Sequence, residues 1–137
     1  MNIQEIKEMV YGACKQISDN ESAVWHTSEW NICAHLRGIF NEVFSGYNVD
    51  VELMKHNRRR PDIVIHKLGD NSDNLVVFQV KKNPKTKDLQ EDLDKIKETF
   101  FSDPYYYKFG ILISVGKLPQ VLPDFDEDKI GIIEVYG

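Results

Sequence analysis

Hydrophobic residues recur at helical spacing in two segments near the N-terminus. In residues 3–17 the apolar stripe consists of Ile3, Ile6, Val10, Ala13, Cys14 and Ile17. In residues 28–44 it consists of Ile32, Cys33, Leu36, Ile39, Phe40 and Val43. Steps of three and four residues place such side chains on one helix face, so both segments are predicted to be amphipathic helices. Thr27 or Ser28 can cap the second helix, and Gly46 follows its end.

The period then changes to that of β-strands. Three strands are predicted, at residues 49–55, 62–66 and 75–81. Pro61 opens the second of them, at a position where a missing N–H is tolerated. A dense turn signal, which includes Gly69 and Asp70, separates the second strand from the third.

A third helix is predicted over residues 88–101, with Asp88 and Glu91 at the spacing of a capping box. Its apolar stripe is Leu89, Leu93, Ile96 and Phe100. Further strands are predicted at residues 109–115 and 130–136, which gives the order α-α-β-β-β-α-β-β. A meander followed by a helix and another strand indicates an α/β fold with a mixed central sheet of about five strands, flanked by helices.

The composition is that of one globular domain, residues 1–137, with 42% hydrophobic and 28% charged residues. The apolar runs are too short to span a bilayer, and the N-terminus does not resemble a signal peptide. The two cysteines, Cys14 and Cys33, fall in helical patterns, so we expect reduced core thiols in a cytoplasmic protein. The histidines and cysteines do not have the spacing of a zinc site.

The net charge of −5 argues mildly against nucleic-acid binding, but binding depends on local rather than total charge. The basic residues cluster at Arg58, Arg59, Arg60, Lys81, Lys82, Lys85 and Lys87. The acidic residues gather elsewhere, notably at Asp124, Asp126, Glu127 and Asp128. A chain with segregated charge can bind phosphate on one face while it is acidic overall.

The third predicted strand ends in an unusual way for a core strand, with Gln79, Val80 and Lys81. Gln79 and Lys81 lie two residues apart and therefore point to the same face. If the second and third strands form a hairpin, Asp62 falls opposite Gln79 or Lys81, and cross-strand neighbours share a face. An acid, an amide oxygen and an ammonium group then converge. This convergence is either a metal site or a simple salt bridge between Asp62 and Lys81.

Two further acids compete for a place beside this group. Glu29 lies on the apolar stripe at the start of the second helix, where it either interacts with the helix dipole or adds a carboxylate to a metal site. Glu52 shares the face of Asp62 if the first turn centres on Arg58. Gln90 and Asp94, on one face of the third helix, are expected to be exposed to solvent.

These residues resemble the PD-(D/E)xK nuclease superfamily, which includes restriction endonucleases, Holliday-junction resolvases and transposase cutting subunits. The resemblance covers residues 28–115 and rests on the ordered segments Pro61-Asp62 and Gln79-Val80-Lys81. It implies a restriction endonuclease-like core. It also implies that Asp62 is a ligand of Mg²⁺ or Mn²⁺, that Gln79 is the second ligand and that Lys81 orients the attacking water.

In the same resemblance Glu29 corresponds to the helical acid of many members, and the Val80 carbonyl is a further candidate ligand. Gln79 departs from the family pattern, which has Asp or Glu at this position. An amide oxygen can coordinate a hard cation but carries no negative charge, so metal affinity should fall unless Glu29 compensates.

The chemistry and charge together predict a divalent-metal-dependent endonuclease acting on DNA. Arg58, Arg59 and Arg60 are either a phosphate clamp or a solvated turn, and Lys82 and Lys85 would extend the clamp. Sequence specificity would then come from a homodimer or a partner subunit. The alternative is a catalytically degenerate nucleic-acid-binding or protein-assembly subunit on the same fold.

Overall fold

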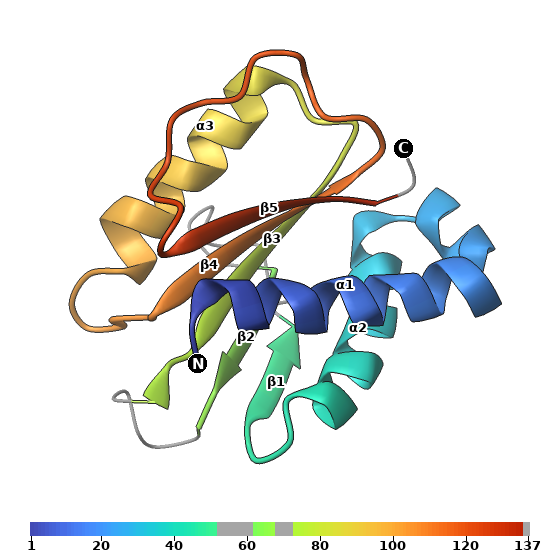
Figure 1. Ribbon diagram of the computed structural model, residues 1–137, viewed down its shortest axis with the longest axis horizontal. Coiled ribbons are helices and arrows are strands. Elements are labelled where there is room, and N and C mark those ends of the chain that lie inside the picture. The colour runs from blue at the N-terminus through green and yellow to red at the C-terminus, as the bar shows by residue number, and fades with distance from the viewer. Residues whose placement is uncertain (52–61, 68–72, 136–137) are drawn as a thin grey trace.

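The computed structural model describes residues 1–51, 62–67 and 73–135, in which a five-stranded sheet has the order β1-β2-β3-β4-β5 (Figure 1). The elements are α1 (Ile3–Asn20), η1 (Ser22–His26), α2 (Glu29–Val43), β1 (Asn48–Val51), β2 (Ile63–His66), β3 (Val76–Lys82), α3 (Thr86–Lys95), η3 (Ile96–Phe100), β4 (Phe109–Val115) and β5 (Ile130–Val135). Strands β1, β2 and β3 form an antiparallel meander. Strand β4 is parallel to β3, and β5 is parallel to β4. The predicted α/β class with a mixed sheet is confirmed.

The ends of the helices differ from the predicted ends. Helix α1 continues to Asn20, and the short helix η1 was not predicted. Helix α3 begins at Thr86 because the carboxylate of Asp88 accepts a hydrogen bond from the backbone N–H of Lys85 (2.9 Å). Asp88 is therefore the third helical residue rather than the cap. The helix continues from Ile96 to Phe100 as one π-helical turn.

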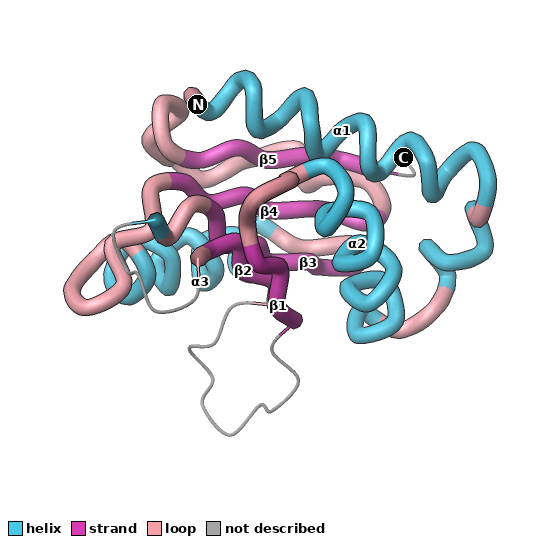
Figure 2. Tube along the Cα trace, turned by 90° about the horizontal axis from the view of Figure 1, so that it is seen from below, coloured by secondary structure: helices cyan, strands magenta, loops and turns pink. Residues whose placement is uncertain are grey.

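Helices α1 and α2 cover one face of the sheet, and α3 covers the other (Figure 2). The rings of Phe40 on α2 and Phe78 on β3 stack with their centroids 4.9 Å apart, which fixes α2 against the sheet. Cys14 and Cys33 are buried in this layer, as predicted. Burial raises the pKa of the Cys14 thiol to about 12, so this thiol stays protonated at neutral pH.

The second core layer lies between the sheet and α3. Val64, Val77 and Leu112 on the strands pack there with apolar residues of α3 and η3, namely Leu89, Leu93, Ile96 and Phe100. Because side chains alternate along a strand, Gln79 and Lys81 share the face of Val77. Phe78 and Val80 belong to the layer of α1 and α2. This is the predicted division of β3, and it directs its polar residues towards α3.

The residue that follows β4, Gly116, contacts the ends of both neighbouring strands, β3 and β5, and its conformation requires glycine. Gly116 has φ +108° and donates its N–H to the carbonyl of Val135 (2.9 Å). A Cβ at this position would lie 2.1 Å from the Oδ1 atom of Asn83, just beyond Lys82 at the end of β3. The turn therefore holds the end of the strand that carries Lys81.

Gly116→Ala is expected to lower the free energy of unfolding by about 2 kcal/mol, because the left-handed backbone and the contact with Asn83 both oppose a side chain. Urea denaturation measures the effect. Gly12→Ala in α1 is the control, since its Cβ would meet no described atom within 4 Å and alanine favours helix. A Gly116→Ala variant as stable as the control would contradict this role.

No helix in the described part of the chain is long and apolar enough to cross a membrane.

Candidate functional site

Asp62 lies against β3 at the position that the hairpin register predicts. The register of β2 with β3 ends at the pair Ile63–Phe78, and Asp62 is the residue that precedes Ile63. The backbone N–H of Asp62 donates to the Phe78 carbonyl (3.0 Å). Its carboxylate oxygen Oδ2 accepts a hydrogen bond from the N–H of Val80 (2.7 Å). These two bonds fix Asp62 beside the segment that ends in Lys81.

The Val80 backbone contributes to the same place. The N–H and C=O of one strand residue point to the same side, so the Val80 carbonyl faces the side on which Asp62 lies. A carboxylate oxygen and a backbone carbonyl oxygen thus lie on the same side of this end of β3.

Gln79 is the buried polar residue of β3. Its side chain is 2% exposed, and its Nε2 atom has no hydrogen-bond partner among the described residues. Lys81, two residues further on, is half-buried on the same face. An unpaired amide between a sheet and a helix is costly, because buried polar groups are almost always hydrogen-bonded.

Asp92 on α3 is a site residue that the sequence analysis missed. Its side chain is 1% exposed, and Oδ2 has no hydrogen-bond partner in the part of the chain that the structure describes. Its other oxygen, Oδ1, lies 3.8 Å from Nζ of Lys95. A signal was present in the sequence, because Asp92 lies three residues after Leu89 and four before Ile96, on the apolar stripe.

Burial raises the pKa of the Asp92 carboxyl from 3.8 to about 6. The positive charges of Lys81 and Lys95 oppose this rise, and the negative charges of Asp62 and Glu29 add to it. The carboxyl of Asp92 is therefore within electrostatic reach of Asp62, Lys81 and Glu29. Helix α3 contributes an acid to the group of residues that the sequence placed on β2, β3 and α2.

Glu29 is the first residue of α2 and is half-buried. The preceding residue, Ser28, caps the helix by accepting a hydrogen bond from the N–H of Asn31 (3.2 Å). Glu29 thus occupies the first turn, where an acid also interacts favourably with the helix dipole. The negative charge of Glu29 also contributes to the raised pKa of the Asp92 carboxyl, and its role beside a metal stays a prediction.

The remaining candidate residues have different outcomes. Gln90 donates to Asp94 (2.9 Å), and both are exposed on α3, as predicted. Glu52 and the basic run Arg58–Arg60 lie outside the described residues.

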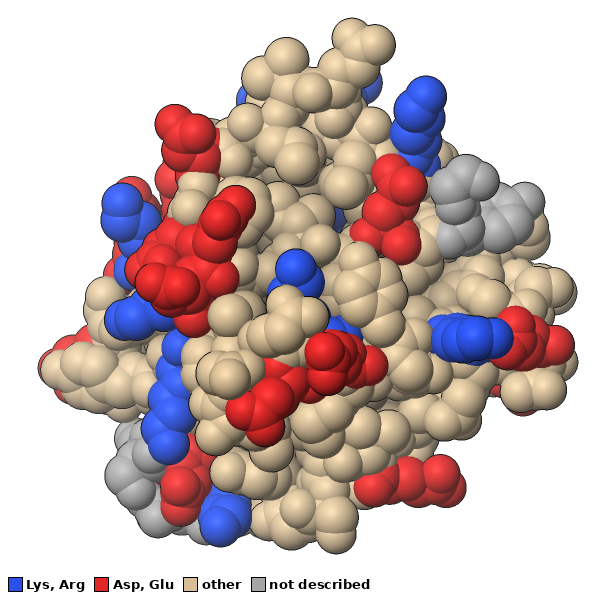
Figure 3. Space-filling model, in the orientation of Figure 1, with Lys and Arg blue, Asp and Glu red and all other residues tan. Residues whose placement is uncertain are grey.

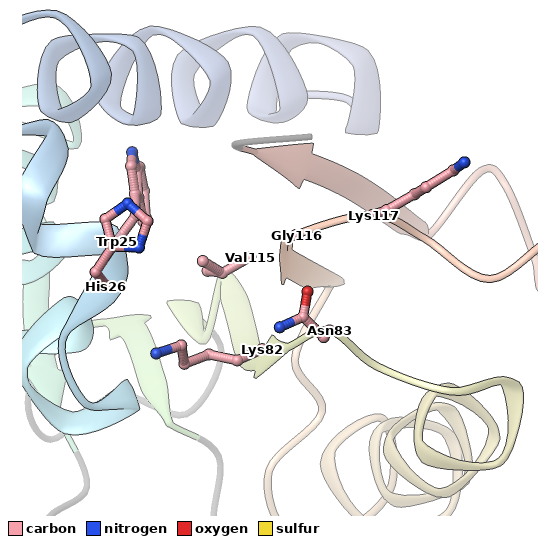
Figure 4. A pocket seen from close by; sticks show the side chains of 7 residues that line it. All are labelled: Trp25, His26, Lys82, Asn83, Val115, Gly116 and Lys117. Carbon is pink, nitrogen blue, oxygen red and sulfur yellow. The ribbon is translucent and has the colours of Figure 1, made fainter.

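Lys82 points to the opposite side of β3 from Lys81, towards η1. Its Nζ donates to the Thr27 carbonyl (2.9 Å) at the rim of a hollow of about 480 Å³ (Figure 4). The hollow is lined by Trp25, His26, Lys82, Asn83, Val115, Gly116 and Lys117. The side chain of Lys117 points away from it in Figure 4. Lys85, exposed before α3, lies further along the same segment.

Within the described ranges, no three or more His, Cys, Asp or Glu residues are grouped so that they could hold a metal ion. Of the described residues, a cation at this site would therefore use at most two acids together with amide or carbonyl oxygens. On the face shown in Figure 3, acidic and basic side chains are interspersed.

Comparisons with protein-family models, curated proteins and solved structures found no match to this chain.

Proposed function

We propose that this domain is a divalent-metal-dependent endonuclease that hydrolyses DNA phosphodiester bonds, in the manner of the PD-(D/E)xK superfamily. The observation that carries the proposal is the position of Asp62, whose two hydrogen bonds to Phe78 and Val80 hold it against the end of β3 that carries Gln79 and Lys81. The topology supports it, because an antiparallel meander, a helix and a strand parallel to β3 are the core that the resemblance implies.

The donor atoms fit a hard divalent cation. Mg²⁺ and Mn²⁺ prefer oxygen ligands, and the site offers the Asp62 carboxylate, the Gln79 amide oxygen and the Val80 carbonyl. The Gln79 amide is buried, and its Nε2 atom has no partner among the described residues, so no contact of Nε2 there prevents a half-turn of the amide that directs the oxygen to a cation. When bound, the cation would lower the pKa of its water and neutralise charge on the phosphate.

The side chains around that position have separate tasks. The ammonium group of Lys81 orients the attacking water and stabilises the negative charge that develops on the phosphate. The hydrogen bond from Val80 holds the Asp62 carboxylate in one orientation. The apolar residues between the sheet and α3, such as Val77 and Leu89, limit the access of bulk water to the site. The low dielectric that results strengthens these charge interactions.

Nicking of supercoiled plasmid and cutting of branched DNA with Mg²⁺ or Mn²⁺ tests the proposal. We expect the wild type to cleave, a chelator to stop cleavage and Lys81→Ala to remove it. Lys15→Ala is the matched control, because Lys15 is exposed on α1 and pairs only locally with Asp19. Cleavage that survives both the chelator and Lys81→Ala would contradict the proposal. A wild type that binds DNA without cutting it would favour a degenerate binding subunit.

DNA binding is expected to weaken steeply with salt, because phosphate contacts release counterions. Lys82→Ala should lower the slope of log K against log salt concentration by about 0.9, the value of one lost phosphate contact. Arg58→Ala combined with Arg60→Ala should lower it further. Fluorescence anisotropy from low to high salt measures the slopes, with Lys15→Ala as control. Absence of binding at low salt would instead favour a protein-assembly subunit.

A further inference from the structure

The layer between β3 and α3 contains two buried polar atoms that have no partner among the described residues, Nε2 of Gln79 and Oδ2 of Asp92. Leaving a buried donor or acceptor unpaired costs about 1–3 kcal/mol, and more for a charged group. Two such atoms in one layer are unusual, since native domains have few of them. An absent ligand that both residues contact would explain both.

The two residues come from opposite sides of that layer. Gln79 extends from the sheet on the face of Val77, and Asp92 lies on α3 beside Leu93. The charge of Lys81, two residues from Gln79, acts on the Asp92 carboxyl, and so does the charge of Asp62. Asp92 is therefore buried away from bulk solvent, and the charges of the proposed metal site act on its carboxyl.

Known partners of Asp92 do not account for its burial. Lys95 approaches Oδ1 only to 3.8 Å, which is longer than a charge-assisted hydrogen bond of about 2.7–2.9 Å. Replacing Asp92 by an apolar residue would remove the free-energy cost of burying its carboxyl group. An acid kept at such a position without a close partner is typical of a ligand or catalytic group rather than a packing residue.

We propose that Asp92 is the second carboxylate ligand of the metal site and supplies the negative charge that Gln79 lacks. This inference deepens the proposed function and rests on the same site. Rotation of the Gln79 amide by half a turn exchanges its nitrogen and oxygen, which are nearly isosteric, and brings Oε1 to the place of the unpaired Nε2. The ligand set then comprises Asp62, Asp92, the Gln79 amide oxygen and the Val80 carbonyl, a set suited to Mg²⁺ or Mn²⁺.

Calorimetric titration of the protein with Mn²⁺, without nucleic acid, tests the inference. We expect Asp92→Asn to weaken Mn²⁺ binding at least about tenfold. Asp94→Asn is the matched control, because Asp94 is on the same helix but is exposed and bonded to Gln90, and it should bind as the wild type does.

A double variant that moves the carboxylate to another position gives a second test. Gln79→Glu combined with Asp92→Asn moves the carboxylate from α3 to β3 and should restore most of the lost affinity. The coupling is measured from the double variant and both single variants. Unchanged Mn²⁺ affinity in Asp92→Asn would overturn the inference. So would an Asp92→Asn protein that cannot fold, because a ligand acid without a close partner is dispensable for folding.

The outcomes separate this inference from the proposed function. If the wild type cleaves DNA with Mg²⁺ while Asp92→Asn binds Mn²⁺ normally, the function stands and the ligand role of Asp92 fails. If Asp92→Asn loses Mn²⁺ binding but the wild type cuts no DNA, the ligand role stands and the function fails. A wild type that binds no Mn²⁺ overturns both.

Discussion

Asp62→Asn is expected to reduce metal-dependent DNA cleavage by roughly 10³-fold while the fold stays intact. The amide oxygen of asparagine can still accept the hydrogen bond from the Val80 N–H, so the position beside β3 is kept. The negative charge is lost, and with it much of the affinity for a hard cation. The variant thus isolates the charge of Asp62 from its structural contact.

Single-turnover cleavage of a labelled duplex measures this effect, with thermal denaturation as the check on folding. The control is Asp19→Asn, since Asp19 is exposed on α1 and forms an ion pair with Lys15 one turn away. An Asp62→Asn protein that cleaves as fast as this control would show that the acid has only a structural role. An Asp62→Asn protein that unfolds would point to the same conclusion.

Asp92→Asn is expected to raise the free energy of unfolding at pH 8 by about 2–3 kcal/mol, because a rise of about two pKa units corresponds to about 3 kcal/mol. The carboxyl has a pKa of about 6 in the fold and 3.8 as its ordinary value. Between these values the folded protein holds a proton that the unfolded chain has released. Stability contributed by this group therefore falls as pH rises from about 4 to about 6, and the penalty is constant above that range.

Urea denaturation at pH 4 and pH 8 measures this prediction. At pH 4 the wild type and Asp92→Asn should differ little, and at pH 8 the variant should be the more stable. Asp94→Asn should stay within about 0.5 kcal/mol of the wild type at both pH values. If Asp92→Asn were less stable at pH 8, the carboxylate would be stabilised by Lys81 or Lys95 and would belong to an ordinary ion pair.

Much of the fold could be predicted because hydrophobic period is a local property. The alternation in β3 correctly divided Val77 and Gln79 from Phe78 and Val80, and it is confirmed by the two core layers. The strand β4 was predicted with its observed bounds. The start of α3 was missed because Asp88 can cap a helix from two positions, and the choice depends on how the chain leaves β3 at Lys85.

The site was harder to predict because it is assembled across elements. Sequence spacing brought Asp62 to Gln79, since a hairpin makes distant positions into neighbours by a simple register. Asp92 was not predicted because it lies on the apolar stripe of α3, whereas Gln90 and Asp94 lie on its polar face. A buried acid within an apolar stripe cannot be explained from the helix sequence alone. Its surroundings include the polar residues of β3, which only the three-dimensional structure brings close to α3.

The position of Lys82 also could not be predicted from the cluster of basic residues in the sequence. The sequence predicts that Lys82 and Lys85 extend a phosphate-binding surface formed by the arginines at positions 58–60. Strand alternation instead sends its amine to Thr27, on the side away from Lys81. Any nucleic acid that contacts both lysines must therefore pass over the end of β3 rather than along one face of the sheet.

The most direct test of the metal site is a crystal of the protein soaked in Mn²⁺, with the ion located by anomalous scattering. We expect one strong peak at a coordination distance of about 2.0–2.3 Å from oxygens of Asp62 and Asp92, with the Gln79 amide oxygen turned towards it. A protein that leaves this position empty at millimolar Mn²⁺, with Gln79 and Asp92 paired to each other or to water, would contradict the account.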